Sequence, residues 1–201
     1  MQINKARLVG TYFSAEQYAP SGLPEIAIVG RSNAGKSSLI NRLCNNNKLA
    51  RTSATPGKTR SINCYEINQS FALMDLPGYG YAAQSEEEKR RWGKLIDGYF
   101  THTEQLCHLL ILCDIRHDPS QSDRDMVEWV EHYQIPYTMI ATKADKIAKS
   151  KRKPQAARLA AKLGNPPFVC FSATEEIGKN DLLQVLETIL TKNAEKGLTD
   201  R

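Results

Sequence analysis

The sequence has no hydrophobic run that is long enough to cross a bilayer. Its longest apolar run, residues 109–113, spans five residues, whereas a membrane-spanning helix needs about 20. The first residues, 1–5, lack the apolar core of a secretory signal peptide. These absences argue against a membrane protein and predict a cytoplasmic one.

Cysteine and histidine are few and show no metal-binding pattern. The five cysteines include no C-x-x-C pair, and their odd number does not suit a disulfide framework. A zinc site and disulfides are therefore both disfavoured. Small buried thiols are expected in the apolar runs, at Cys107, Cys113 and Cys170. Ordinary surface or packing positions are expected for His102, His108, His117 and His132.

The length of 201 residues suits a single α/β domain, and the formal net charge of +5 is unevenly distributed. Seven Lys or Arg and no acidic residue lie between Lys146 and Leu163. A second basic group consists of Lys48, Arg51, Lys58 and Arg60. Either group could contact the phosphates of an RNA. A solvated helix face explains the first group equally well.

Strand-like and helix-like segments alternate from Pro24 onward, which predicts an α/β fold with a mostly parallel sheet and helices on both faces. Apolar strands are expected at residues 26–29, 109–113, 137–141 and 168–171. An antiparallel pair at 61–67 and 70–75 would make the sheet mixed. A segment around 8–13 could add an edge strand, which gives six or seven strands in all.

Helical spacing of apolar residues predicts further helices around 92–100, 126–133 and 182–190. A capping box, Ser85 with Glu88 three residues later, precedes the first of them. Aromatic residues at such spacing indicate packing rather than ligand binding. We therefore expect Trp92 and Trp129 to pack against neighbouring elements.

Residues 30–37 match the phosphate-loop pattern GxxxxGK[ST] in full. They follow an apolar run and open a helical stretch, which is the setting that the pattern requires. Backbone N–H groups of such a loop surround the phosphates, Lys36 neutralises the β- and γ-phosphates, and Ser37 holds Mg²⁺. The sequence therefore predicts a nucleoside triphosphate held by Gly30, Arg31, Ser32, Asn33, Ala34, Gly35, Lys36 and Ser37.

Two later elements are expected to detect the γ-phosphate. At the end of an apolar strand, a DxxG element consists of Asp75, Leu76, Pro77 and Gly78. In P-loop NTPases such an aspartate reaches Mg²⁺, directly or through water, and the glycine N–H contacts the γ-phosphate. A hydroxyl between the two motifs could complete the Mg²⁺ shell only while this phosphate is present. Chemistry alone leaves the candidates Thr52, Thr55 and Thr59 open.

The element that selects the base consists of Thr142, Lys143, Ala144 and Asp145. The carboxylate of Asp145 can accept hydrogen bonds from N1–H and the 2-amino group of guanine. Adenine offers no such pair of donors and would leave this carboxylate unpaired. The stem of Lys143 can lie over the base. Backbone N–H groups for the guanine O6 would come from another strand end, at Phe171, Ser172, Ala173 and Thr174.

Taken together, these stretches resemble the EngB family of bacterial GTPases, also called YihA or YsxC. The resemblance rests on GLPEIAIVGRSNAGKSSLINRL, LARTSATPGKTRSIN, MDLPGYGYA and IATKADKI. It implies a Ras-like P-loop GTPase domain over residues 24–195, with an N-terminal extension over 1–23 and a short C-terminal tail over 196–201. It also implies GTP and GDP as ligands, and a role in assembly of the large (50S) ribosomal subunit from its precursor. A need for the protein in normal cell division and septation is implied as well.

Carried over residue by residue, the resemblance assigns further nucleotide contacts to Gly57, Lys58, Thr59, Arg60 and Ser61. It selects Thr59, together with Ser37, as a ligand of Mg²⁺, and Asp75 is expected to reach the same ion. Thr142 stands where most GTPases have Asn, although Thr agrees with this family. The missing Asn amide predicts somewhat looser nucleotide binding.

Catalysis is assigned to Lys36, Thr59, Gly78 and Asn33, and is expected to be slow. Many GTPases place Gln directly after DxxG to orient the attacking water, whereas this chain has Tyr79. Asn33 stands where K⁺-activated GTPases have an Asn that helps to bind K⁺, although it could equally only stabilise the loop.

The main hypothesis is a GTPase switch that binds a ribosomal precursor, its rRNA or its proteins, as a monomer. The alternative is a binding module in which the nucleotide fixes a shape and hydrolysis is incidental. A P-loop kinase is disfavoured because it leaves residues 142–145 unexplained.

Overall fold

The computed structural model describes residues 1–51, 61–80 and 85–199. Here the chain forms a seven-stranded sheet in the order β1-β3-β4-β2-β5-β6-β7. The strands are β1 (Ala6–Tyr12), β2 (Glu25–Gly30), β3 (Ile62–Ile67), β4 (Phe71–Asp75), β5 (Leu106–Asp114), β6 (Tyr137–Thr142) and β7 (Phe168–Cys170). Strands β4, β2, β5, β6 and β7 are parallel, whereas β3 is antiparallel to both β1 and β4. The predicted mixed, mostly parallel sheet is confirmed.

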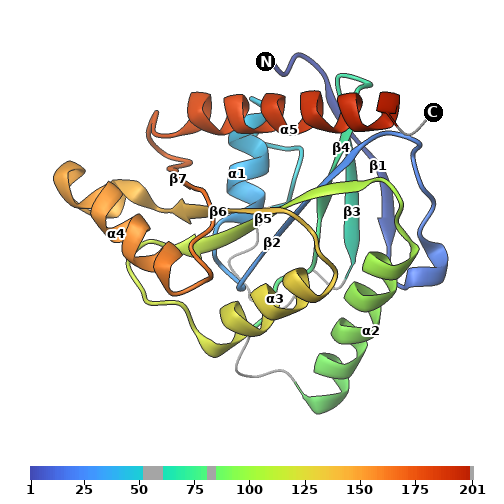
Figure 1. The fold of residues 1–201 in the computed structure, drawn as a ribbon, viewed down its shortest axis with the longest axis horizontal. Coiled ribbons are helices and arrows are strands. Elements are labelled where there is room, and N and C mark those ends of the chain that lie inside the picture. The colour runs from blue at the N-terminus through green and yellow to red at the C-terminus, as the bar shows by residue number, and fades with distance from the viewer. Residues whose placement is uncertain (52–60, 81–84, 200–201) are drawn as a thin grey trace.

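Helices cover both faces of this sheet (Figure 1). They are α1 (Lys36–Leu43), α2 (Glu86–His102), α3 (Gln121–His132), α4 (Lys149–Ala161) and α5 (Lys179–Thr199). Apolar side chains of α1 and α5 pack in one core, and those of α2, α3 and α4 pack in a second core on the opposite face. Successive side chains of β2 point to opposite faces of the sheet, so Ile28 belongs to the first core and Val29 to the second.

A tight turn joins β3 and β4, and the two ends of the fold are formed by strand β1 and helix α5. Strands β3 and β4 are joined by Asn68, Gln69 and Ser70. The φ values of Asn68 and Gln69 are 51° and 57°, and Ser70 N donates to Ile67 O at 2.9 Å, which closes a tight turn. At the sheet edge, β1 pairs with β3 from Ala6 to Tyr12. Helix α5 continues to Thr199, into the segment expected as a tail. No helix in the described ranges is long and apolar enough to cross a membrane.

The expected packing residues are partly as predicted. Cys113 is buried, as expected. Cys107 and Cys170 are only half-buried, because Cys107 lies near the start of β5 and Cys170 is the last residue of β7. Trp92 of α2 and Trp129 of α3 stack with ring centroids 5.7 Å apart and planes 7° from parallel. The two indoles therefore join these helices, as the sequence predicted.

A buried carboxylate fastens the N-terminal segment to α2. Glu25, the first residue of β2, is fully buried and accepts hydrogen bonds from the hydroxyls of Tyr18 (2.8 Å), Tyr99 (2.7 Å) and Thr103 (3.1 Å). Burial of a carboxylate is costly unless hydrogen bonds satisfy it, and three hydroxyls do so here. This clamp lies at the amino end of β2, so the opposite end of the strand is left for residues 30–37.

Replacing Tyr99 by Phe should lower the free energy of unfolding by about 1.5–3 kcal/mol, because Glu25 loses a charge-assisted hydrogen bond inside the core. Urea unfolding followed by circular dichroism measures the change. Tyr12→Phe is the control, since its hydroxyl donates to the carbonyl of Ala19 at 3.2 Å near the surface and should matter less. Equal costs for the two variants would contradict the clamp.

Candidate nucleotide-binding site

The phosphate-loop segment runs from the carboxyl end of β2 into the first turn of α1. Asn33 and Gly35 adopt positive φ values of 66° and 97°, which turn the backbone between strand and helix. Gly30 approaches β5 so closely that a Cβ there would lie 2.9 Å from the carbonyl oxygen of Leu112. The segment ends at the N-terminus of α1, whose free N–H groups and dipole favour a bound anion.

Asp75 lies beside this loop because β4 pairs in parallel with β2, with Ile28 opposite Asp75. Asp75 is 3% exposed, and its Oδ1 has no hydrogen-bond partner in the described ranges. Burial raises the pKa of Asp75, and the positive charge of Lys36 opposes that shift. Burial likewise lowers the pKa of Lys36, and Asp75 opposes it. The unpaired carboxylate oxygen fits a site for a cation or its bound water.

Any metal at this position needs ligands besides carboxylates. Within the described part of the chain, no group of three or more His, Cys, Asp or Glu could hold a metal ion. Hydroxyls, water and phosphate oxygens are the usual additional ligands of Mg²⁺. Ser37, in the first turn of α1, has such a hydroxyl.

Several predicted residues cannot be placed. Outside the described residues lie Thr52, Thr55, Gly57, Lys58, Thr59 and Arg60. Their assignments as switch residues, nucleotide contacts or Mg²⁺ ligand stay predictions. Ser61 is buried directly before β3.

The DxxG segment lies against the phosphate loop. Leu76 N donates to Ile28 O at 3.0 Å, which continues the pairing of β4 with β2. A Cβ on Gly78 would lie 3.2 Å from both Lys36 Nζ and Ser32 N, so a side chain there would crowd the loop. Ser32 N donates to Tyr79 O at 3.0 Å and is therefore engaged by this segment rather than free for a phosphate.

Thr142 ties the base side of the site to the phosphate side. This last residue of β6 is buried, and its hydroxyl lies 2.8 Å from the carbonyl oxygen of Ala34 and 3.2 Å from that of Cys113. The hydroxyl thus connects β6, β5 and the phosphate loop, which is a positioning role that a short side chain can fulfil. The sequence identified Thr142 but not these partners.

Asp145 is held by two neighbours. Its side chain is 7% exposed; Oδ1 accepts a hydrogen bond from Ser172 Oγ at 2.7 Å, and Oδ2 lies 3.0 Å from Lys146 Nζ. The hydrogen bond from Ser172, and then the contacts with Lys146, hold the pKa of Asp145 below its usual value against the effect of burial. The group is therefore an ionised acceptor at neutral pH. Ser172 Oγ also accepts from the backbone N–H groups of Thr174 and Glu175 at 3.2 and 3.1 Å.

A cavity of about 230 Å³ opens between these elements and α1. It is lined by Gly35, Ser38, Thr142, Lys143, Asp145, Lys146, Phe171, Ala173 and Thr174. The structure therefore brings together the predicted base-binding residues of two strand ends. Thr174 also belongs to the strand end that the sequence indicated, whereas Ser38 and Lys146 were missed as site residues, although each lies next to a residue that was named.

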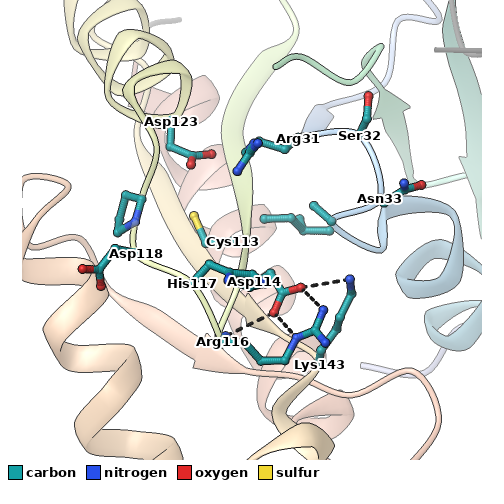
Figure 2. Close-up of a pocket in the computed structure, with 13 residues that line it drawn as sticks. Arg31, Ser32, Asn33, Cys113, Asp114, Arg116, His117, Asp118, Asp123 and Lys143 are labelled. Atoms are coloured by element: carbon teal, nitrogen blue, oxygen red, sulfur yellow. Dashed lines mark hydrogen bonds and ion pairs between the residues drawn. The ribbon is translucent and has the colours of Figure 1, made fainter. Parts of the chain in front are cut away.

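A second cavity, of about 250 Å³, lies on the other side of the phosphate loop (Figure 2). Asp114 lines it and pairs with Arg116 at 2.7 Å and with Lys143 Nζ at 2.9 Å. Burial alone would raise the pKa of Asp114, but hydrogen bonds from Arg116 and Lys143 hold it well below its usual range. The ion pair with Asp114 fixes the end of the Lys143 side chain. The backbone of Lys143 is left-handed, with a φ of 58°. In Figure 2 the amide of Asn33 points away from this cluster.

The loop that carries Ser172 is closed by Gly178. Ser172 N donates to Ile177 O at 3.1 Å, and Leu182 N donates to Gly178 O at 2.9 Å, where α5 begins. Gly178 has a φ of 74°, and a Cβ there would lie 1.9 Å from the carbonyl oxygen of Cys170. Only glycine allows the chain to return past β7 at this point.

Comparison with known proteins shows the family to which the chain belongs. A family model described as "50S ribosome-binding GTPase" matches residues 25–143. The chain is 46% identical over 184 residues to the probable GTP-binding protein EngB of Shouchella clausii. The aligned region spans 90% of this chain and 93% of that protein. It is 45% identical over 198 residues to the probable GTP-binding protein EngB of Geobacillus thermodenitrificans, spanning 96% of this chain and 100% of that protein.

Solved structures show the same fold. A crystal structure of a probable GTP-binding protein EngB matches with a TM-score of 0.67 and 21% identity, over 84% of this chain and 99% of that chain. Era in complex with MgGDPNP and nucleotides 1506–1542 of 16S ribosomal RNA matches with a TM-score of 0.64 and 21% identity, over 84% and 56%. The predicted Ras-like GTPase fold is confirmed, and the chain belongs to the EngB family of GTP-binding proteins.

Proposed function

We propose that this chain is a GTP-operated switch in assembly of the large (50S) ribosomal subunit and that it hydrolyses GTP slowly. The observation that carries the switch is the close approach of Gly78 to the phosphate loop, where even a Cβ would lie 3.2 Å from Lys36 Nζ and Ser32 N. A γ-phosphate neutralised by Lys36 would meet the DxxG segment there, so its presence or loss would bias the position of this segment. GTP and GDP would thus favour different surfaces of the protein.

Guanine would be read by Asp145 in the 230 Å³ cavity. Ser172 holds the carboxylate in place, and the ion pair with Asp114 holds Lys143 beside the same cavity. The hydrogen bond from Ser172 and the ion pair with Asp114 fix the side chains of Asp145 and Lys143 before the base enters. Less conformational entropy is then lost when the nucleotide binds.

Mg²⁺ would be held by Ser37 and Thr59, with Asp75 reaching it directly or through water. The ion would neutralise charge on the phosphates during transfer. The residues that the structure describes fit this role, since Asp75 Oδ1 is buried and unpaired. Lys36 would share that work, and Gly78 would contact the γ-phosphate.

Slow hydrolysis is supported by the residue after DxxG. The Tyr79 side chain is buried in the core between α2 and α3, so its hydroxyl is not available to orient a water molecule. A partner or a K⁺ near Asn33 would then have to complete catalysis. The burial of Tyr79 also supports the alternative function, which is a nucleotide-dependent binding module whose hydrolysis is incidental.

A ribosomal partner is supported by relatives and by charge. The matching family model is described as ribosome-binding, and the Era structure contains 16S ribosomal RNA. Arg158 of α4 and Lys162, directly after this helix, pair with Asp118, whereas Lys149 and Lys153 of α4 are exposed and have no ion-pair partner in the described ranges. Four residues apart, they share one helix face and could contact successive phosphates. The role in cell division and septation rests on family resemblance.

Asp145→Asn should weaken GTP binding by about 100-fold or more, because two hydrogen bonds to a charged acceptor are lost. Ser172 can still donate to the new amide oxygen, which leaves the amide N–H₂ to face the base. Xanthosine triphosphate, whose 2-oxo group accepts from that N–H₂, should then bind better than GTP. Isothermal titration measures both, with exposed Asp118→Asn as the control; unchanged GTP affinity would disprove the guanine assignment.

If Asn33 helps to bind K⁺, GTP turnover should be faster in KCl than in NaCl at equal ionic strength. Phosphate release measures this rate. Asn33→Gly keeps the left-handed backbone (φ 66°) but removes the amide, so the acceleration by K⁺ should disappear. Equal turnover of the unmodified protein in both salts would leave Asn33 with a role in loop structure only.

Co-sedimentation with 50S precursors in GDP, GTP and a non-hydrolysable analogue tests the switch. Binding should rise with GTP and be trapped by the analogue, whereas equal binding in all three states favours the module. A salt series should show a slope smaller by about 1.5 for the double variant Lys149→Gln, Lys153→Gln, since two phosphate contacts are lost. Lys94→Gln with Lys192→Gln, exposed lysines of α2 and α5, should keep the slope.

A further inference from the structure

The residue after DxxG is built into the protein interior. Tyr79 is 4% exposed and belongs to the core formed by the sheet with α2, α3 and α4. Its hydroxyl donates a hydrogen bond to Asp123 Oδ1 at 2.9 Å. Burial, and then the charge of Asp123, raise the pKa of Tyr79 well above its usual value. The phenol is therefore a permanent donor and not an acid or base.

Asp123 is a fixed acceptor for this bond. It is the third residue of α3, and its Oδ2 accepts hydrogen bonds from both N and Oγ of Ser120 at 2.7 Å in a capping box. The box leaves Oδ1 for Tyr79. Without the phenol hydroxyl, a buried carboxylate oxygen would lose its only hydrogen-bond donor in the described ranges, which costs more than a surface hydrogen bond.

Trp92 of α2 holds the same segment from the other side. Its Nε1 donates to the carbonyl oxygen of Pro77 at 2.9 Å, and the Tyr79 ring meets the indole edge to face at 6.1 Å between centroids. Trp92 is itself stacked on Trp129 of α3. Residues 77 and 79 are therefore both anchored to the helices, and Gly78 lies between the two anchors.

The backbone of Tyr79 completes the arrangement. Ser32 N donates to Tyr79 O at 3.0 Å, and Tyr79 N lies 3.4 Å from Gly30 O. The segment is thus fixed to the phosphate loop by its main chain and to α2 and α3 by its side chains. Gly78, with no side chain of its own, takes its position from these neighbours.

We propose that Tyr79 is a positioning residue, which sets the place of Gly78 relative to the γ-phosphate through its hydrogen bond to Asp123 and its contact with Trp92. The proposal rests on the GTP-operated switch proposed above. It gives the tyrosine after DxxG a function other than that of the water-orienting glutamine of many GTPases. It also predicts that the phenol hydroxyl of Tyr79 affects the ratio of the affinities for GTP and GDP, but not the affinity for GDP itself.

The test compares Kd values for GDP and for a non-hydrolysable GTP analogue, by isothermal titration with Mg²⁺ present. Tyr79→Phe should weaken the analogue about tenfold relative to GDP, with GDP affinity unchanged, because only Gly78 loses its place. Tyr133→Phe is a control at the surface. Its hydroxyl also donates to an aspartate across α3 and α2, Asp97, but lies away from residues 77–79.

The outcomes separate the two proposals. If the unmodified protein binds both nucleotides equally, the switch itself is wrong. If it distinguishes them and folded Tyr79→Phe does so equally well, the positioning role is wrong. Should Tyr79→Phe not fold, Trp92→Phe replaces it: this variant keeps a ring but loses the donor to Pro77, and an unchanged ratio overturns the proposal.

Discussion

An incompletely compensated pair of opposite charges underlies the whole site. Asp75 is buried at the end of β4, where one of its oxygens has no partner among the residues that the structure describes, and Lys36 is the cation whose charge favours its ionised form. Burial disfavours the charged form of each group. A phosphate would compensate Lys36, and a divalent cation would compensate Asp75. The protein alone leaves the arrangement electrostatically incomplete, which explains why nucleotide and Mg²⁺ are expected to bind together.

The parallel sheet brings the other parts to the same edge. Strands β2, β4 and β6 all end there, so the phosphate loop, DxxG and the base-binding element meet although they are far apart in the sequence. The hydroxyl of Thr142 joins two of these strand ends through Ala34. The end of β6 and the phosphate loop are therefore fixed relative to one another by a buried hydrogen bond.

Local patterns in the sequence were sufficient for the elements and for the named contacts, because glycine spacing, apolar runs and capping boxes are local properties. They predicted the phosphate loop, Gly78 and Asp145 as parts of one site; in the structure Gly78 lies beside the phosphate loop, and Asp145 lines a cavity with Gly35. They could not identify the partner of Lys143, since Asp114 comes from another strand. Nor could they show that Tyr79 turns inward, because its partner Asp123 lies 44 residues away.

Gly178 has a consequence for the loop that carries Ser172. A Cβ at this position would collide with the carbonyl oxygen of Cys170 and would lie 3.3 Å from Phe171 Cα, directly before Ser172. The path of the backbone at Gly178 thus helps to set where Ser172, and with it the carboxylate of Asp145, can lie.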